Sequence, residues 1–110
     1  MLDNFPREVS AEILRRFSPE EPAGKGTLFK ELENFFSGER GFGKITDINS
    51  VDGLRIFFSN GDIAHIRPSG NAPQLRIYSN ADTQERANEI VKMGIAEPDG
   101  ILRELEKSVK

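Results

Sequence analysis

Cysteine is absent from this 110-residue sequence, and histidine occurs only once, as His65. Without thiols the chain can form neither a disulfide framework nor a thiolate metal site, and a single histidine leaves no zinc constellation. No apolar run reaches the roughly 18 residues that a membrane-spanning helix needs, and residues 1–17 lack the apolar centre of a signal peptide. We therefore expect a soluble, cytoplasmic protein with no membrane partner.

An excess of positive charge is also missing. Fifteen lysines and arginines stand against 18 aspartates and glutamates, which gives a formal net charge of −3. This balance argues against bulk electrostatic binding to nucleic acid, although local basic patches remain possible. The chain does have 36% hydrophobic residues, enough for one domain to bury a core. We expect a single domain over 1–110, with a helical part at 1–42 and a sheet with C-terminal helices at 43–110.

Two helices are expected before the middle of the chain. Residues 10–17 predict a short helix with Ser10 as its N-cap. A turn-rich stretch follows, and residues 27–36 then predict a second helix that ends at Ser37-Gly38.

Two more helical segments are expected near the C-terminus. Asp82 is in position to cap a helix from Thr83 to about Met93, and Gly94 is expected to stop that helix. A final turn or helix begins at Asp99-Gly100. Its apolar stripe is formed by Ile101, Leu102 and Leu105.

Strand-like runs occupy the middle of the chain, at residues 44–49, 54–59, 63–67 and 74–79. Asp52-Gly53 and Asn60-Gly61 are strong hairpin turns, so the first three strands should form an antiparallel meander. Because the segments show no βαβ alternation, they predict an α+β fold. The expected architecture is a four-stranded, mainly antiparallel sheet with helices packed on one face.

Alternation within these runs separates two faces of the predicted sheet. The first face is apolar and suited to meet helices; it comprises Leu54, Ile56, Phe58, Ala64, Ile66, Leu75 and Ile77. The second face is basic and aromatic; it comprises Arg55, Phe57, His65, Arg67, Arg76 and Tyr78.

The segment between the last two strands has the composition of a phosphate site. It reads Arg67-Pro68-Ser69-Gly70-Asn71-Ala72-Pro73. The arginine offers a planar fork for two oxygens, and Ser69, Asn71 and the loop amides can bind the others. The two prolines restrict φ, which lowers the cost of ordering the loop. The simpler interpretation is a polar turn, because proline, serine, glycine and asparagine are the commonest turn residues.

This loop, together with Gln-Leu-Arg-Ile-Tyr at residues 74–78, resembles the phosphate-binding loop in the C-terminal domain of the α-D-phosphohexomutases. These are the phosphomannomutases, phosphoglucomutases and phosphoglucosamine mutases. The similarity covers roughly residues 43–93, including 52–56, 60–63 and the helix after 80–82, with a weaker likeness at 3–6. The resemblance implies a TATA-binding-protein-like arrangement of the sheet and its helices.

The resemblance also implies a function. Such enzymes move phosphate between the 1- and 6-positions of a hexose, using a phosphorylated serine and Mg²⁺. Their C-terminal domain grips the phosphate that is not being transferred. By this likeness Arg67 would be the bidentate anchor, and Ser69, Gly70 and Asn71 would supply a hydroxyl, an N–H and a carboxamide or N–H. The expected partners are a hexose phosphate and the remaining domains of the intact mutase.

The sequence departs from the family pattern in two ways. Many members have Thr-Glu or Thr-Thr where this chain has Asn71-Ala72, a variant that we associate with bacterial phosphomannomutase-like members. The chain also lacks a nucleophile loop of the Ser-His-Asn-Pro type, an Asp-x-Asp-x-Asp metal loop and a Gly-Glu-x-Ser-Gly sugar loop. We therefore expect no catalytic residue and no cofactor in this chain, with Mg²⁺ bound by another domain, and no mutase activity from the chain alone.

Other signals are weaker. Residues 24–27, Gly-Lys-Gly-Thr, hint at a nucleotide-binding loop, but the first glycine of that motif and a preceding apolar strand are missing. His65 could act as a general base, yet a strand histidine is the simpler interpretation. Arg55 and Arg76 could contact a substrate or pair with acidic neighbours.

Two alternative functions remain open. The basic, aromatic sheet face could stack RNA bases, although the closely spaced aromatics and glycines of the RNA-recognition motif are absent. The chain could also be a stand-alone module that binds a phosphorylated ligand without catalysis.

Overall fold

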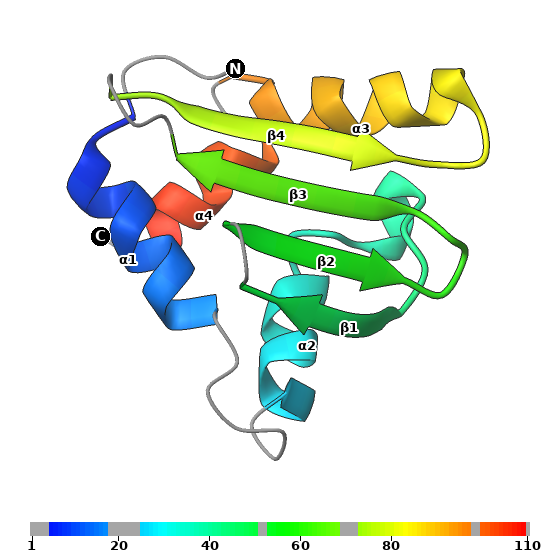
Figure 1. Cartoon of the computed structure of the whole chain (residues 1–110), viewed down its shortest axis with the longest axis horizontal. Helices are drawn as coiled ribbons and strands as arrows, with labels where there is room; N and C mark the ends of the chain where they lie inside the picture. Colours follow the sequence, from blue (N-terminus) through cyan, green and yellow to red (C-terminus); the bar gives the residue numbers. More distant parts are fainter. Residues whose placement is uncertain (1–4, 18–24, 51–52, 69–72, 98–99, 110) are drawn as a thin grey trace.

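The computed structural model describes residues 5–17, 25–50, 53–68, 73–97 and 100–109. Three helical segments precede the sheet: α1 (Arg7–Phe17), α2 (Lys25–Glu33) and a short 3-10 helix, η2 (Gly38–Arg40). The strands are β1 (Ile45–Asn49), β2 (Leu54–Phe58), β3 (Ile63–Pro68) and β4 (Leu75–Asn80). Two helices follow, α3 (Gln84–Ile95) and α4 (Ile101–Val109) (Figure 1).

The strands form one four-stranded sheet in the order β1-β2-β3-β4, and every neighbouring pair is antiparallel. Because each strand pairs with the next one along the chain, the sheet is a simple meander. Gly61 enables the tight turn between β2 and β3, since its φ of 93° is open to glycine but costly for other residues. The predicted α+β class and the antiparallel sheet are confirmed.

The helices cover one face of this sheet, which Figure 1 views from the uncovered side with α4 lying behind the strands. All seven side chains of the predicted apolar face are buried. Their partners from the helices include Ile13 and Phe17 of α1, Leu32 of α2, Ile90 of α3, and Leu102 and Leu105 of α4. The core therefore lies between the sheet and the helices, and none of the described helices covers the other face of the sheet.

Both N-terminal helices differ from their predicted bounds. Helix α1 begins at Arg7, and Ser10 is a buried residue inside it rather than its N-cap. The reason is Pro6, whose restricted φ suits a helix start and whose carbonyl accepts hydrogen bonds from the amides of Val9 and Ser10, both at 3.1 Å. Helix α2 ends at Glu33, because the following amides tighten into turns that carry the chain to buried Phe36.

Helix α3 also differs at both of its ends. Its N-cap is Thr83, not Asp82, because the Thr83 side chain accepts a hydrogen bond from the Arg86 amide at 3.1 Å. Gly94 does not stop the helix; it is buried within it. A Cβ at Gly94 would lie 2.8 Å from Cδ1 of Ile77, so this glycine lets the helix approach β4 closely.

A half-buried arginine, Arg86, joins the turn after β2 to helix α3. Arg86 donates from Nε to Asp62 at 3.1 Å and from Nη1 to the carbonyl of Arg40 at 3.1 Å. Its guanidinium also lies 4.8 Å from the centre of the Phe42 ring. Since the Asp62 side chain is only 5% exposed, its charge depends on this partner for compensation.

Replacing Arg86 by methionine should lower the free energy of unfolding by about 2–4 kcal/mol, because Asp62 would be left charged and buried. Urea denaturation followed by circular dichroism measures the loss. Lys92→Met, on an exposed position of the same helix, is the matched control and should change stability little. Equal stability of the two variants would contradict a structural role for the Arg86–Asp62 pair.

Candidate phosphate-binding site

Arg67 lies near the end of β3, and its side chain is exposed on the open face of the sheet. Directly opposite it on β4 is Arg76. The remaining predicted phosphate ligands, Ser69, Gly70 and Asn71, lie outside the described residues. The structure therefore places one of the four predicted site residues, at the point where β3 enters the predicted loop.

Both ends of this loop are held by the fold. Pro68 pairs with Leu75, so the strands remain in register up to the loop. At the last residue of this segment, the carbonyl of Pro73 accepts a hydrogen bond from the amide of Phe5 at 2.8 Å. Phe5 is itself fully buried, which anchors this contact in the core. A ligand-binding loop with fixed ends loses less conformational entropy when it binds.

Gly53 leaves room for the backbone of Ile66 and the side chain of Arg67 on β3. Its φ is 79°, and a Cβ there would lie 2.3 Å from the carbonyl oxygen of Ile66 and 3.0 Å from Cγ of Arg67. Only glycine therefore lets the start of β2 approach β3 at this point. The turn signal at Asp52-Gly53 predicted a glycine turn, but this approach to Arg67 depends on the strand pairing and is not visible in the sequence.

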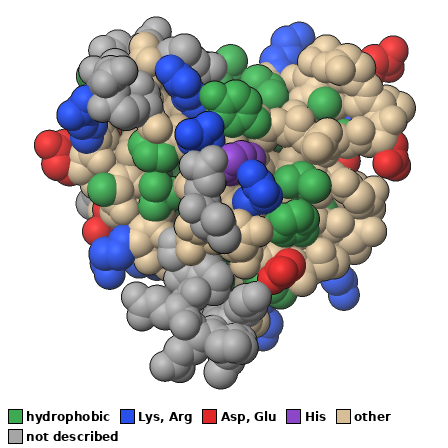
Figure 2. All heavy atoms as spheres, in the orientation of Figure 1, with side chains coloured by type: hydrophobic (Ala, Val, Ile, Leu, Met, Phe, Trp, Pro, Cys, Tyr) green, Lys and Arg blue, Asp and Glu red, His purple; other side chains and the backbone are tan. Residues whose placement is uncertain are grey.

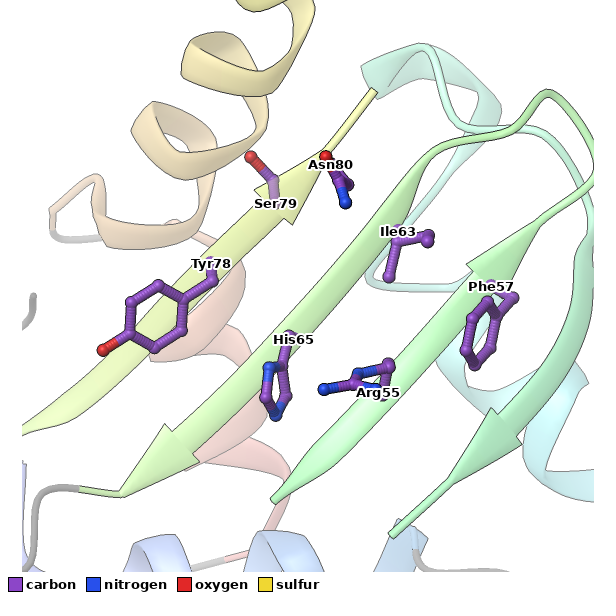
Figure 3. A pocket seen from close by; sticks show the side chains of 7 residues that line it. All are labelled: Arg55, Phe57, Ile63, His65, Tyr78, Ser79 and Asn80. Carbon is purple, nitrogen blue, oxygen red and sulfur yellow. The ribbon is translucent and has the colours of Figure 1, made fainter. Parts of the chain in front are cut away.

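A row of side chains crosses the open face next to Arg67. Arg55, His65 and Tyr78 are direct neighbours on β2, β3 and β4, as Figure 3 shows. The rings of His65 and Tyr78 lie 6.0 Å apart, and Tyr78 is the one large hydrophobic side chain among the described residues that is exposed, at 43%. The structure thus brings together the basic and aromatic residues predicted for this face.

This row borders a shallow hollow of about 310 Å³. The hollow is lined by Arg55, Phe57, Ile63, His65, Tyr78, Ser79 and Asn80. Ile63 and Asn80 were not among the predicted face residues, although continuing the alternation from His65 and Tyr78 would have found both. In Figure 2, lysine or arginine and hydrophobic side chains gather around the histidine on this face.

The structure also locates the residues of the weaker sequence signals. Lys25 begins helix α2, and Gly26 and Thr27 lie within that helix. His65 is a half-buried residue in the middle of β3 and lines the hollow described above. Among the described residues, no three histidines, aspartates or glutamates are grouped closely enough to hold a metal ion. Within the same part of the chain, no helix has the length and apolar character to cross a membrane.

Fold and site together define an α+β domain whose sheet carries exposed Arg67 where β3 runs into the predicted polar loop. Residues 20–97 match the family described as phosphoglucomutase/phosphomannomutase, C-terminal domain. A phosphomannomutase of Sinorhizobium fredii is 36% identical over 95 residues, which cover 86% of this chain and 18% of that protein. The chain belongs to the phosphoglucomutase/phosphomannomutase family and corresponds to its C-terminal domain.

Two further relatives are a second phosphomannomutase and a phosphopentomutase. A phosphomannomutase of Salmonella muenchen is 52% identical over 54 residues, which cover 47% of this chain and 11% of that protein. A phosphopentomutase of Thermococcus kodakarensis is 30% identical over 102 residues, which cover 93% of this chain and 19% of that protein. The chain thus spans less than a fifth of the length of each of these relatives.

Replacing Gly53 by alanine should destabilise the domain by about 1–3 kcal/mol and weaken phosphate binding, because the new Cβ would press on Ile66 and the stem of Arg67. Thermal denaturation and a phosphate titration measure the two effects. Gly38→Ala is the control, since a Cβ at that position would meet nothing within 4 Å. Wild-type stability and phosphate affinity in Gly53→Ala would show that the close approach is unimportant.

Proposed function

We propose that this domain binds the phosphate of a phosphosugar through Arg67, Ser69, Gly70 and Asn71. The enzyme it serves is of the phosphomannomutase/phosphoglucomutase type, which interconverts hexose 1- and 6-phosphates. The observation that carries the proposal is the position of Arg67, exposed on the open basic face where β3 runs into the predicted phosphate loop. The family of the chain supports the same assignment.

The names of the relatives favour the phosphate as the group that is recognised. Phosphomannomutase, phosphopentomutase and phosphoglucosamine mutase differ in the sugar, and all of them name a phosphorylated one. A domain common to these proteins is best suited to the group that their substrates share. An arginine fork with neighbouring hydroxyl and amide donors matches the oxygens of a phosphate.

Such binding would contribute to catalysis at a distance. A phosphate held by Arg67 and the loop fixes one end of the sugar, so that the hydroxyl at the far end is presented to the reacting groups. Binding energy from the phosphate that does not react is then used to orient the substrate. In this proposal a catalytic serine and Mg²⁺ would belong to other domains of the intact enzyme, and the chain alone would bind substrate without converting it.

Replacing Arg67 by alanine should weaken phosphate binding by about 2–4 kcal/mol, because a bidentate, charged contact is lost. Since Arg67 is exposed, the fold should remain nearly intact. An amide NMR titration with mannose 1-phosphate measures both properties. In the wild-type chain, shifts should centre on the amides of residues 69–71 at millimolar ligand.

Inorganic phosphate and a short RNA are the comparison ligands for this titration. Phosphate alone should shift the same amides, and RNA should leave them unchanged. If the loop amides stay silent and RNA shifts Arg55, His65 and Tyr78 with a steep salt dependence, the RNA-binding alternative replaces the proposal. Unfolding of Arg67→Ala would instead assign this arginine a structural role.

A further inference from the structure

The hollow on the open face of the sheet lies further from the predicted phosphate loop than Arg67 does. Arg55, His65 and Tyr78 form the row of the hollow nearest the loop, and Arg67 lies one row closer to the loop. Successive residues on one face of a strand are about 6.5–7 Å apart. No residue of the loop lines the hollow among those that the structure describes, so the hollow is a separate place on this face.

Arg55 is the charged group of this hollow. Its side chain is half-buried and extends from β2 toward His65, as Figure 3 shows. Within the described ranges, Arg55 has no ion pair, and no oxygen accepts a hydrogen bond from it. Even Oδ1 of Asn49, the residue directly opposite on β1, is buried without a partner. A half-buried charge without a protein partner is costly, which favours an anionic ligand at this point.

The one carboxylate that the described strands place on this face does not neutralise Arg55. Asp47 of β1 is paired with Phe57, and its Oδ1 accepts a hydrogen bond from the amide of Ile48 at 2.9 Å. The arginines of this face therefore outnumber its carboxylates, although the whole chain has a formal net charge of −3. An anion that approaches this side of the sheet is attracted by the local charge.

The side chains around Arg55 favour a carboxylate over a phosphate. One guanidinium fork accommodates the two oxygens of a carboxylate in a planar, bidentate arrangement. A phosphate monoester carries a charge of about −1.5 to −2 near neutral pH, which a single arginine matches less well. Phe57 and Ile63 line the same hollow and are half-buried apolar side chains. They would contact a short apolar stem attached to the carboxylate.

We propose that this hollow binds a carboxylate on a short apolar stem, with Arg55 as its anchor. The volume of about 310 Å³ lies at the lower end of the range of small-molecule sites, about 300–1,000 Å³, so the bound group is small. The carboxylate can belong to a free organic acid or to a glutamate side chain of another protein segment. The inference goes beyond the proposed function, because it concerns another ligand and other residues.

Two side chains of the hollow are unique in the chain. His65 is the only histidine, Tyr78 is the only tyrosine, and tryptophan is absent. Tyr78 is also 43% exposed, so a ligand in the hollow can reach its ring. Tyrosine fluorescence and the imidazole NMR signals of the unlabelled sequence therefore both report from this hollow.

The test is a titration of the full 110-residue chain with butyrate at pH 7 and constant ionic strength. Butyrate should change the Tyr78 fluorescence and the His65 signals in a saturable way, with a dissociation constant in roughly the millimolar range. Butyramide, which has nearly the same shape but no charge, should change neither signal. A short peptide with one glutamate between apolar residues is the second ligand. Tighter binding of the peptide would assign the carboxylate to a protein segment, and tighter binding of butyrate would assign it to a free acid.

Three variants test the role of Arg55. Arg55→Gln should lose roughly 10-fold or more in butyrate affinity, as expected for a lost charged hydrogen bond. Arg55→Lys keeps the charge but not the fork and should lose several-fold. Arg16→Gln, at an exposed position of α1 on the helical side, is the matched control and should change the affinity less than about 2-fold. Should Arg55→Gln fail to fold, Arg55→Lys decides the question, and wild-type affinity in that variant refutes the inference.

Several results would overturn the inference. One is the absence of any change at Tyr78 and His65 with both butyrate and the peptide, and another is wild-type butyrate affinity in folded Arg55→Gln. If butyrate binding is lost in Arg67→Ala and kept in Arg55→Gln, the carboxylate occupies the proposed phosphate site instead. The proposed function is tested by phosphate at the loop amides, so either site can fail while the other stands.

Discussion

The register of the four strands is the constraint on which the site depends. Side chains alternate between the two faces of a sheet, so shifting one strand by a single residue would exchange the faces for every residue of that strand. In β3 such a shift would move Arg67 toward the core and bring Ile66 to the surface. Ala64 and Ile66 resist it, because both are fully buried against the helices. Packing on one face thus determines which groups the other face can offer to a ligand.

The same alternation explains why much of the fold could be predicted from the sequence. A half-buried strand shows its register directly, since apolar and polar residues alternate along it. The four strands, the turn at Asn60-Gly61 and the buried face were all predicted, to within one residue at the strand ends. The loop between β3 and β4 was found by its composition and by the family resemblance.

The ends of the helices could not be predicted from the sequence in the same way. Ser10 has the chemistry of an N-cap, but Pro6 starts the helix one turn earlier. Gly94 has the composition of a helix terminator, yet its lack of a side chain is used for packing against Ile77. Serine and glycine serve more than one purpose in helices, and only tertiary contacts decide which purpose applies. The contact of Gly53 with Arg67 escaped prediction for a related reason, since it joins different strands.

The hydrogen bond from Phe5 to Pro73 links the exit of the loop to the beginning of the fold. Phe5 also lies beneath the guanidinium of Arg103 in α4, 5.6 Å from its ring centre, and Arg103 is paired with Glu97 and Glu106. Burial alone would lower the pKa of Arg103, but the hydrogen bonds to these two glutamates raise it, so the group stays charged. The hydrogen bond from Phe5 therefore ties Pro73, at the end of the predicted loop, to a buried side chain that also contacts α4.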